Sequence, residues 1–296
     1  MGMTYTALRF LQLARRDHDV RFDATLTIGR QSLYLSSAEA RALTKEFGLT
    51  QTLPIGDPYA DAFFRAAFGV ENINSIDVSS YEGATLLHDL NRPVPVEWDE
   101  CADVVIDGGA LEHVFNFPTA LASCMRMVRT GGHLVIFAVA NNNCGHGFYQ
   151  FSPELFFRAL ASEHGFEITR MIALPHLFAG AELGGNGRWH EVTDPASVRE
   201  RVVVMGARGL ALLVLARKLR HVVPFESAPQ QSDYSVMWNT ASARGPSPSV
   251  PPDTIRLLRQ TLSRELPRPL VNIVRGVQQR IACSLLNRKH FNPVRR

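Results

Sequence analysis

The sequence predicts an α/β fold in which a doubly wound, mostly parallel sheet of seven strands carries helices on both faces. Apolar runs of strand length alternate along the chain with amphipathic segments of helix length. The central runs, 102–109 and 133–139, are apolar without alternation, which is typical of parallel strands buried on both faces. Glycines follow several helical segments at the points where the chain turns back toward the sheet.

Seven segments have the length and composition of strands. No obvious helical crossover separates the last two, so we expect them to pair antiparallel at the edge of the sheet. The strands are expected at residues 24–29, 72–78, 84–90, 102–109, 133–139, 166–174 and 210–219.

Helices are expected between these strands, and several have a recognisable start and stop. The clearest has Ser152 as N-cap and Pro153 at its first helical position, and ends at Gly165. Ser37 is expected to cap a helix that ends at Gly48. The remaining helical segments are 1–19, 59–69 and 118–130, the last of them ending at a Gly-Gly pair.

The composition is typical of a globular protein. The chain has 296 residues, 46% hydrophobic and 20% charged, which is enough to bury a full core. No uncharged apolar stretch reaches the roughly 18 residues of a membrane span, and segment 1–19 is typical of an amphipathic helix rather than a signal peptide. The four cysteines lack a CxxC spacing, so neither a zinc knuckle nor a disulfide framework is expected. We therefore expect a cytoplasmic protein.

Charge divides the chain into an acidic body and a basic tail. Residues from 250 onward carry a net charge of +8, which leaves −5 on the rest. An acidic body argues against nucleic acid as a partner. We expect a main domain over 1–220, a Pro/Ser-rich linker or arm over 221–252 and a basic helical extension over 253–296. The apolar stripe of this extension would pack on its own domain or in a homodimer, or attach peripherally to an anionic membrane.

Acidic residues close several of the expected strands. Asp77, Asp89 and Asp107 each lie where a strand ends, and the polar stretch after Val139 follows another strand. A doubly wound sheet binds its ligand beyond the carboxyl ends of its strands. We therefore expect these four positions to converge on one site.

Two stretches of this region resemble a known superfamily. "VVIDGGALEHVFNFPTAL" followed by "MVRTGGHLVIF" resembles the fourth and fifth strands of class I S-adenosylmethionine-dependent methyltransferases. "HDLNRPVP" and "GHGFYQFSPELF" resemble a bacterial subgroup often found beside polysaccharide-biosynthesis proteins. The resemblance spans roughly residues 24–220. It implies a Rossmann-like fold, S-adenosylmethionine as cofactor, and methyl transfer to oxygen or nitrogen of a sugar, glycan precursor or small metabolite.

The first loop departs from the superfamily's pattern. A glycine-rich E/DxGxGxG usually lies against the methionine end of the cofactor, whereas this chain has "TIGRQSLYLS", with Gly29 alone. Arg30 and Gln31 are therefore expected either to lie outside the cofactor's path or to contact it differently, for instance Arg30 with the cofactor's carboxylate.

The resemblance also implies roles for the strand-end residues. Asp77 would bind the ribose hydroxyls, and Asp89 with Asn91 would face the adenine. Asp107 and Gly108 lie at the switch point of the sheet. Each acid has an alternative role as a cap or turn residue.

The loop after the fifth expected strand, "NNNCGHGFYQFSP", carries most of the candidates for catalysis. His146 has a side chain suited to accepting a proton at neutral pH, and Tyr149 and His113 are the other catalytic candidates. Acceptor-binding candidates are Glu112, Asn142 and Gln150. Alternatively, these loop side chains hydrogen-bond the loop to the core. No metal site is expected.

Two functions remain open on the sequence alone. One is a methyltransferase that binds S-adenosylmethionine and a small-molecule or glycan acceptor. The other is a non-catalytic protein of the same fold, which the lone Gly29 favours, acting as a binding or assembly partner. A nicotinamide-dependent oxidoreductase is excluded because no GxGxxG follows a strand.

Overall fold

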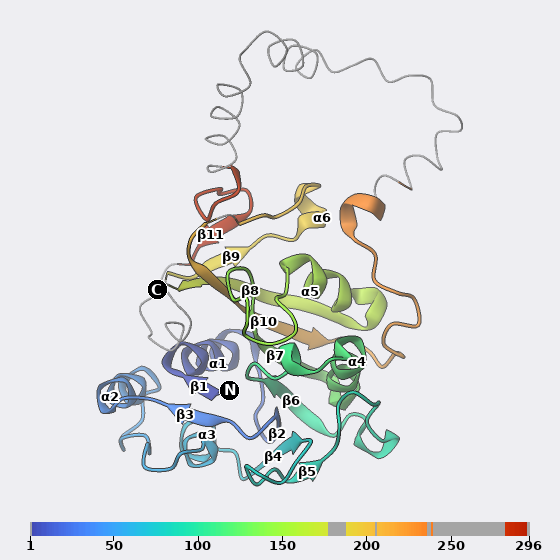
Figure 1. Ribbon diagram of the computed structural model, residues 1–296. Coiled ribbons are helices and arrows are strands. Elements are labelled where there is room, and N and C mark those ends of the chain that lie inside the picture. The colour runs from blue at the N-terminus through green and yellow to red at the C-terminus, as the bar shows by residue number, and fades with distance from the viewer. Residues whose placement is uncertain (1, 177–187, 205, 236–237, 239–281, 295–296) are drawn as a thin grey trace, which may run out of the picture.

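The computed structural model describes residues 2–176, 188–204, 206–235, 238 and 282–294. Within these residues the chain forms an α/β fold around a mixed sheet of nine strands, ordered β11-β9-β8-β10-β7-β6-β2-β4-β5 (Figure 1). Neighbouring strands from β5 to β7 all pair in parallel. These five are β5 (Leu86–Leu87), β4 (Asn72–Asp77), β2 (Ala24–Ile28), β6 (Ala102–Asp107) and β7 (Val128–Val139).

The other half of the sheet is antiparallel and corrects the expected strand count. β10 (Gly209–Lys218) pairs antiparallel with both β7 and β8 (Phe166–His176), so the expected antiparallel pair exists. It does not form the edge, because β9 (His190–Val192) and β11 (Phe291–Pro293) continue the sheet beyond β8. The described sheet therefore has two strands more than the seven expected.

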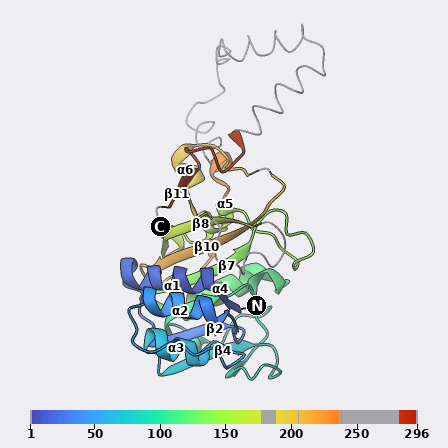
Figure 2. The same cartoon turned by 90° about the vertical axis from the view of Figure 1, so that its left-hand side faces the viewer.

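Helices cover both faces of the sheet, as expected of a doubly wound fold. One face carries α1 (Tyr5–His18), α2 (Ser37–Glu46) and α3 (Asp61–Phe68), which lie in front of the sheet in Figure 2. The other carries α4 (Phe117–Met127) and α5 (Pro153–Ala159). The alternation of side chains along β6 divides the core, because Val104 and Ile106 pack with the first group of helices and Val105 packs with the second.

Three helix boundaries differ from the expected ones. Ser36, not Ser37, caps α2, and it forms a capping box with Glu39. The helix begun by Pro153 ends at Ala159, and a 3₁₀ turn, Ser162–His164, fills the remaining distance to Gly165. α4 ends at Met127 rather than at the Gly-Gly pair, because β7 already begins at Val128.

A buried lysine binds the C-terminal end of α4. Lys218, at the end of β10, is 2% exposed, and its Nζ donates to the carbonyl oxygens of Met125, Arg126 and Val128 at 3.2, 3.3 and 2.7 Å. A cation is favourable at the C-terminal end of a helix, where carbonyls lack intrahelical partners. Burial lowers the pKa of Lys218, and the nearby Glu100 opposes that shift.

A second, two-stranded parallel sheet forms from the N-terminal segment. β1 (Gly2–Thr4) pairs with β3 (Ser32–Tyr34), and Thr4 then caps α1 by accepting from the amide of Ala7. Gly2 is required at this contact, because a Cβ there would lie 2.5 Å from the carbonyl oxygen of Ser32. The sequence predicted the helix but not the strand before it.

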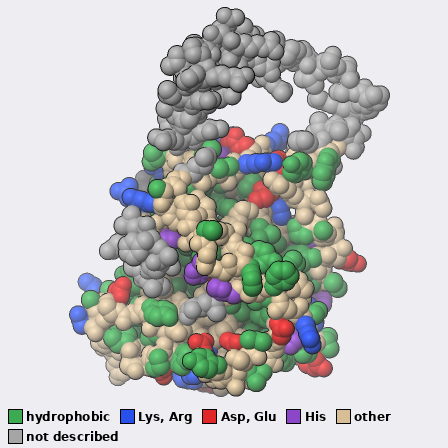
Figure 3. Space-filling view, viewed as in Figure 1, with side chains coloured by type: hydrophobic (Ala, Val, Ile, Leu, Met, Phe, Trp, Pro, Cys, Tyr) green, Lys and Arg blue, Asp and Glu red, His purple; other side chains and the backbone are tan. Residues whose placement is uncertain are grey.

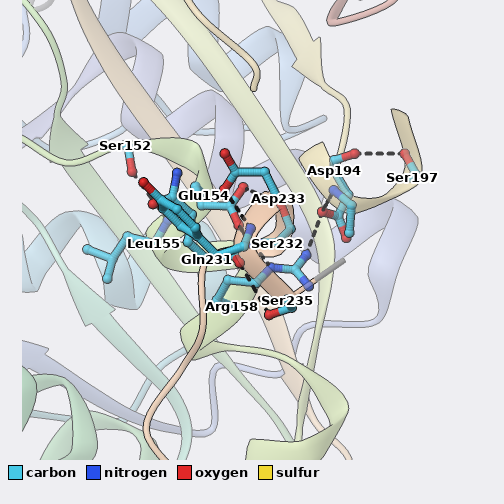
Figure 4. Close-up of polar contacts among 12 residues, drawn as sticks. Ser152, Glu154, Leu155, Arg158, Asp194, Ser197, Gln231, Ser232, Asp233 and Ser235 are labelled. Atoms are coloured by element: carbon cyan, nitrogen blue, oxygen red, sulfur yellow. Dashed lines mark hydrogen bonds and ion pairs between the residues drawn. The ribbon is translucent and has the colours of Figure 1, made fainter. Parts of the chain in front are cut away.

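The segment that follows β10 contacts the body through Ser232. The amide and hydroxyl of Ser232 donate to the carboxylate of Glu154 in α5 at 2.7 and 3.1 Å (Figure 4). In the same group, Arg158 pairs with Asp194 at the N-cap of α6 (Pro195–Val198). Most of the expected linker and helical extension, 239–281, lies outside the described residues. None of the described helices is long and apolar enough to span a membrane.

Candidate functional site

Two adjoining cavities open at the carboxyl ends of the parallel strands. The smaller, of about 230 Å³, is lined by residues from the ends of β2 and β4 and from the turns after β5 and β6. It brings together four of the positions expected to bind the cofactor, namely Gly29, Asp77, Asp89 and Asn91. The expected convergence of strand ends is therefore present for these residues.

Local hydrogen bonds fix the shape of the smaller cavity. Gly29 ends β2 in a left-handed conformation (φ 70°), and its amide donates to the carbonyl of Ile76 at 2.8 Å. Asp89 accepts from the backbone and side-chain nitrogens of Asn91 at 3.0 and 2.8 Å, and these bonds lower the pKa of Asp89. Asn91 in turn accepts from the amide of Asn116. Asp89 is therefore held as a carboxylate at the rim.

The larger cavity, of about 410 Å³, shares His113 with the smaller one. Its walls are mainly apolar, including Phe137, Val139, Leu174 and Leu213 from the central strands. The polar and glycine positions in it include Gly108, Glu112, His113 and His146 from the expected site, together with Gly2, Thr4 and Tyr34 from the small sheet. Of these, Glu112, His113 and His146 lie close together and form a polar end to a mainly apolar space.

Two buried carboxyl groups lie beneath this polar end. Glu112, in the 3₁₀ turn Leu111–His113, is 1% exposed, and burial followed by the nearby charge of Asp107 raises its pKa to about 8. Asp107 is fully buried, and its Oδ1 accepts from the amides of Ala110 and Leu111 at 2.7 and 3.3 Å. Burial raises the pKa of Asp107 to about 7. Among the described residues, neither Oδ2 of Asp107 nor Oε2 of Glu112 has a hydrogen-bond partner.

The loop after β7 brings His146 against this turn. The amides of Phe148 and Tyr149 donate to the backbone oxygen of Glu112 at 2.9 and 3.3 Å. As a result, Nε2 of His146 lies 3.5 Å from Oε1 of Glu112, and the rings of His146 and His113 lie 5.4 Å apart. Figure 3 shows histidine side chains together near the middle of the face that it presents. Burial and the neighbouring His146 lower the pKa of His113.

Two residues expected to contact the cofactor do not line either cavity. Arg30 lies outside both cavities: it donates to Asp61 at 3.0 Å and to the carbonyl of Glu82 at 3.1 Å, and it stacks on Tyr59. Asp107 does not line either cavity, because its carboxyl turns inward to hold the backbone turn that follows β6. Both residues take the structural role that the sequence had offered as the alternative.

Three expected residues of the loop after β7 also hold backbone rather than line a cavity. The hydroxyl of Tyr149 donates to the carbonyl of Phe115 at 2.6 Å. Asn142 donates to the carbonyls of Gly206 and Arg208, and Gln150 accepts from the amide of Asn143. These contacts correspond to the alternative that the sequence offered for the loop, in which its side chains hold the loop to the core.

Gln31 has a position that the sequence left undecided. Its side chain is 3% exposed and donates to the carbonyls of Ile28 and Gly29 at 2.7 and 3.0 Å. Its Oε1 faces Gly108 so closely that a Cβ at Gly108 would collide with it, and this oxygen has no hydrogen-bond partner among the described residues. Gln31 thus fills space between the first loop and the turn after β6.

The contribution of the N-terminal segment to the larger cavity was also missed. Thr4 and Ala7 line it from the start of α1, and Gly2 lines it from β1. The signal was present in part, because a threonine just before an apolar-periodic run is a favoured helix N-cap. The sequence of a three-residue strand does not indicate which cavity the strand will border.

No protein-family model matches the chain, and no curated protein matches it significantly. Solved structures do match. A Bacillus halodurans protein assigned as a methyltransferase is 14% identical, with 72% of this chain and 98% of that chain covered and a TM-score of 0.41. The N-methyltransferase NodS of Bradyrhizobium japonicum, in complex with S-adenosylhomocysteine, is 14% identical, with coverage of 73% and 88% and a TM-score of 0.38.

A third structure is the 1,6-didemethyltoxoflavin-N1-methyltransferase of Burkholderia thailandensis, with bound 1,6-didemethyltoxoflavin and S-adenosylhomocysteine. It is 12% identical, with 71% of this chain and 76% of that chain covered and a TM-score of 0.38. The expected polysaccharide-associated subgroup finds no support in these comparisons. Because the identities and TM-scores are low, we argue function from the side chains of the site itself.

Proposed function

We propose that this protein is an S-adenosylmethionine-dependent methyltransferase that acts on an oxygen or nitrogen of a small molecule. The observation that carries the proposal is the pair of carboxylates, Asp77 and Asp89, in a strand-end cavity that adjoins a larger apolar cavity through His113. A nucleoside cofactor fits the first space, and an acceptor fits the second.

The smaller cavity suits the adenosine half of the cofactor. Asp77 closes β4 beside the turn at Gly29, where a carboxylate can accept from both ribose hydroxyls. Asp89 and Asn91 supply acceptor and donor atoms for the edge of a base. S-adenosylmethionine supplies a methyl group activated on a positively charged sulfur.

The larger cavity selects and orients the acceptor. Its apolar walls exclude water and favour an acceptor with a hydrophobic surface, so among sugars, glycan precursors and small metabolites we favour the last. His146 accepts the proton that leaves the acceptor as the new bond to carbon forms and the carbon–sulfur bond breaks, its electron pair remaining on sulfur. The resulting imidazolium would favour the deprotonated form of Glu112, 3.5 Å away, and that carboxylate would in turn stabilise the imidazolium.

The test is calorimetric titration with S-adenosylmethionine and S-adenosylhomocysteine. We expect micromolar binding by the wild type, weakened at least about tenfold in Asp77→Ala, because loss of one hydrogen bond to a charged group costs roughly 1.5–3 kcal/mol. Glu97→Ala removes an exposed acid outside both cavities and is the matched control, expected to bind like the wild type. Absence of binding by the wild type would contradict the proposal.

The position of Gln31 favours a second candidate, a non-catalytic protein of this fold. Its side chain fills space beside the first loop, where the methionine end of the cofactor would otherwise approach the backbone. If Gln31 blocks the cofactor, the wild type will not bind S-adenosylhomocysteine and Gln31→Ala will. Equal binding by both proteins would remove this candidate.

A further inference from the structure

We propose that Glu112, His113 and His146 together bind a divalent transition-metal ion at the polar end of the larger cavity. Each residue offers one ligand atom, and the three atoms lie within 4.8 Å of one another. The residues come from two segments, the turn after β6 and the loop after β7, which main-chain hydrogen bonds hold together. The sequence spacing alone did not indicate this cluster.

The distances are close to those of a metal centre. Zinc with bonds of about 2.0–2.2 Å in tetrahedral geometry places its ligand atoms roughly 3.4 Å apart. Oε1 of Glu112 and Nε2 of His146 are already 3.5 Å apart. The longest edge of the triangle therefore needs to close by at most about 1.4 Å. The two histidines are partly exposed, so rotation of their rings can supply this adjustment.

The carboxylate ligand is a buried side chain rather than an exposed one. Glu112 is 1% exposed, and its Oε2 has no hydrogen-bond partner among the described residues. Its backbone oxygen anchors the loop that carries His146. Gly147 allows this close approach, since a Cβ there would lie 2.9 Å from that oxygen and 3.1 Å from Nδ1 of His113. A cation bound at Oε1 would compensate the burial of this carboxylate, whose other oxygen is unpaired.

The ligand set indicates the class of metal. Two imidazoles and one carboxylate are typical of catalytic zinc and of non-haem iron, whereas magnesium and calcium prefer all-oxygen ligands. Three protein ligands leave at least one coordination position open, and these ligands line the cavity proposed for the acceptor. The geometry thus points to an ion that binds an exogenous oxygen or nitrogen.

The role of the ion, unlike its binding, rests on the proposed methyltransferase function. A bound divalent ion would fix the acceptor's hydroxyl in the larger cavity and lower its pKa. The proton would then leave to solvent before transfer, and His146 would serve as a ligand instead of a proton acceptor. This role suits an acceptor that is a small hydroxylated molecule with a hydrophobic surface.

The test uses the full-length protein stripped of metal by a chelator. Zinc binding is measured by calorimetry with a competing chelator, and cobalt binding by visible absorption, which reports coordination number. We expect one ion per chain and the intense cobalt absorption of a four- or five-coordinate site. His113→Ala, His146→Ala and Glu112→Gln should each weaken binding at least about tenfold, since even indirect partners of metal ligands cost 10–100-fold. His221→Ala removes a histidine outside the cluster and should bind like the wild type.

Either of two results would overturn the metal site. These are a zinc dissociation constant weaker than about 100 μM, or affinities unchanged in all three ligand variants. Circular dichroism melting of each variant checks that it is folded. Titration of the metal-free protein with S-adenosylhomocysteine distinguishes the two proposals. Metal binding without nucleoside binding would contradict only the methyltransferase function. Nucleoside binding without metal binding would contradict only the metal site.

Discussion

Replacing Lys218 with methionine should destabilise the protein more than any change of an exposed lysine. Methionine keeps most of the apolar stem of Lys218 but removes the ammonium that contacts three carbonyls where α4 meets β7. The same ammonium lies 3.3 Å from the carboxylate of Glu100. Its loss therefore leaves several acceptors in a region from which water is excluded.

The magnitude follows from these contacts. A buried acceptor left without a donor costs roughly 1–3 kcal/mol. The carbonyl of Arg126 still accepts from the amide of Glu100 at 2.9 Å, so only the carbonyls of Met125 and Val128 are counted. At the lower value these two give a loss of about 2 kcal/mol. Methionine avoids the cost of burying a charge, which is why we take the lower value for each carbonyl.

Urea unfolding followed by circular dichroism measures this loss. The midpoint for Lys218→Met should fall while the slope m stays unchanged, because the same surface is exposed on unfolding. Lys45→Met changes an exposed lysine at the end of α2 and should stay within about 0.5 kcal/mol of the wild type. A free energy of unfolding for Lys218→Met within 1 kcal/mol of the wild type would refute the reasoning.

Three further changes test other parts of the fold. Burial lowers the pKa of His133 to about 4, so the unfolded state binds an extra proton below about pH 6.5. As the pH falls from 7 to 4, His133 should therefore cost up to about 3 kcal/mol of stability, and His133→Gln should flatten that dependence in unfolding measured across this range. An unchanged slope would contradict the assignment.

Gly108→Ala should lower the free energy of unfolding by roughly 1–3 kcal/mol, because the new methyl group collides with Gln31. In the Gln31→Ala background the same change should cost much less, and a double-mutant cycle of unfolding free energies measures the difference. Additive losses would mean that the two side chains do not meet. Phe291→Ala, at a fully buried position, should cost roughly 3–5 kcal/mol in chemical unfolding. The exposed Phe148→Ala should change little, and equal effects of the two would show that β11 is not part of the core.

The sequence predicted the strands with long apolar runs and missed four short ones, β1, β3, β9 and β11. β6 and β7 were predicted because their continuous apolar runs are typical of strands that are buried on both faces of a sheet. β9 and β11 have three residues each, "HEV" and "FNP", and carry no periodicity. Pairing with a neighbour far away in the chain makes them strands, and local propensity does not encode that contact.

Positions that depend on the order of the parallel strands were easier to predict than positions that depend on how the loop after β7 packs on the turn after β6. Asp77 and Asp89 reach a cavity because parallel strands end at the same edge. Tyr149 and His146 belong to one polar loop, yet only His146 lines a cavity. The side chain of a polar loop residue can point into a cavity or hydrogen-bond to backbone groups. Here the outcome depends on how the loop packs, which is set by the two amides that donate to the backbone oxygen of Glu112.

The strands at the two edges of the sheet bear on how the protein behaves at high concentration. β5 has two residues, and β11 has three and ends in a proline that offers no N–H. Edges this short give another chain little backbone to add to, which protects against edge-to-edge aggregation. A protein clipped ahead of residue 291 would lose β11 and bare β9, which also has only three residues, so the new edge would be equally short.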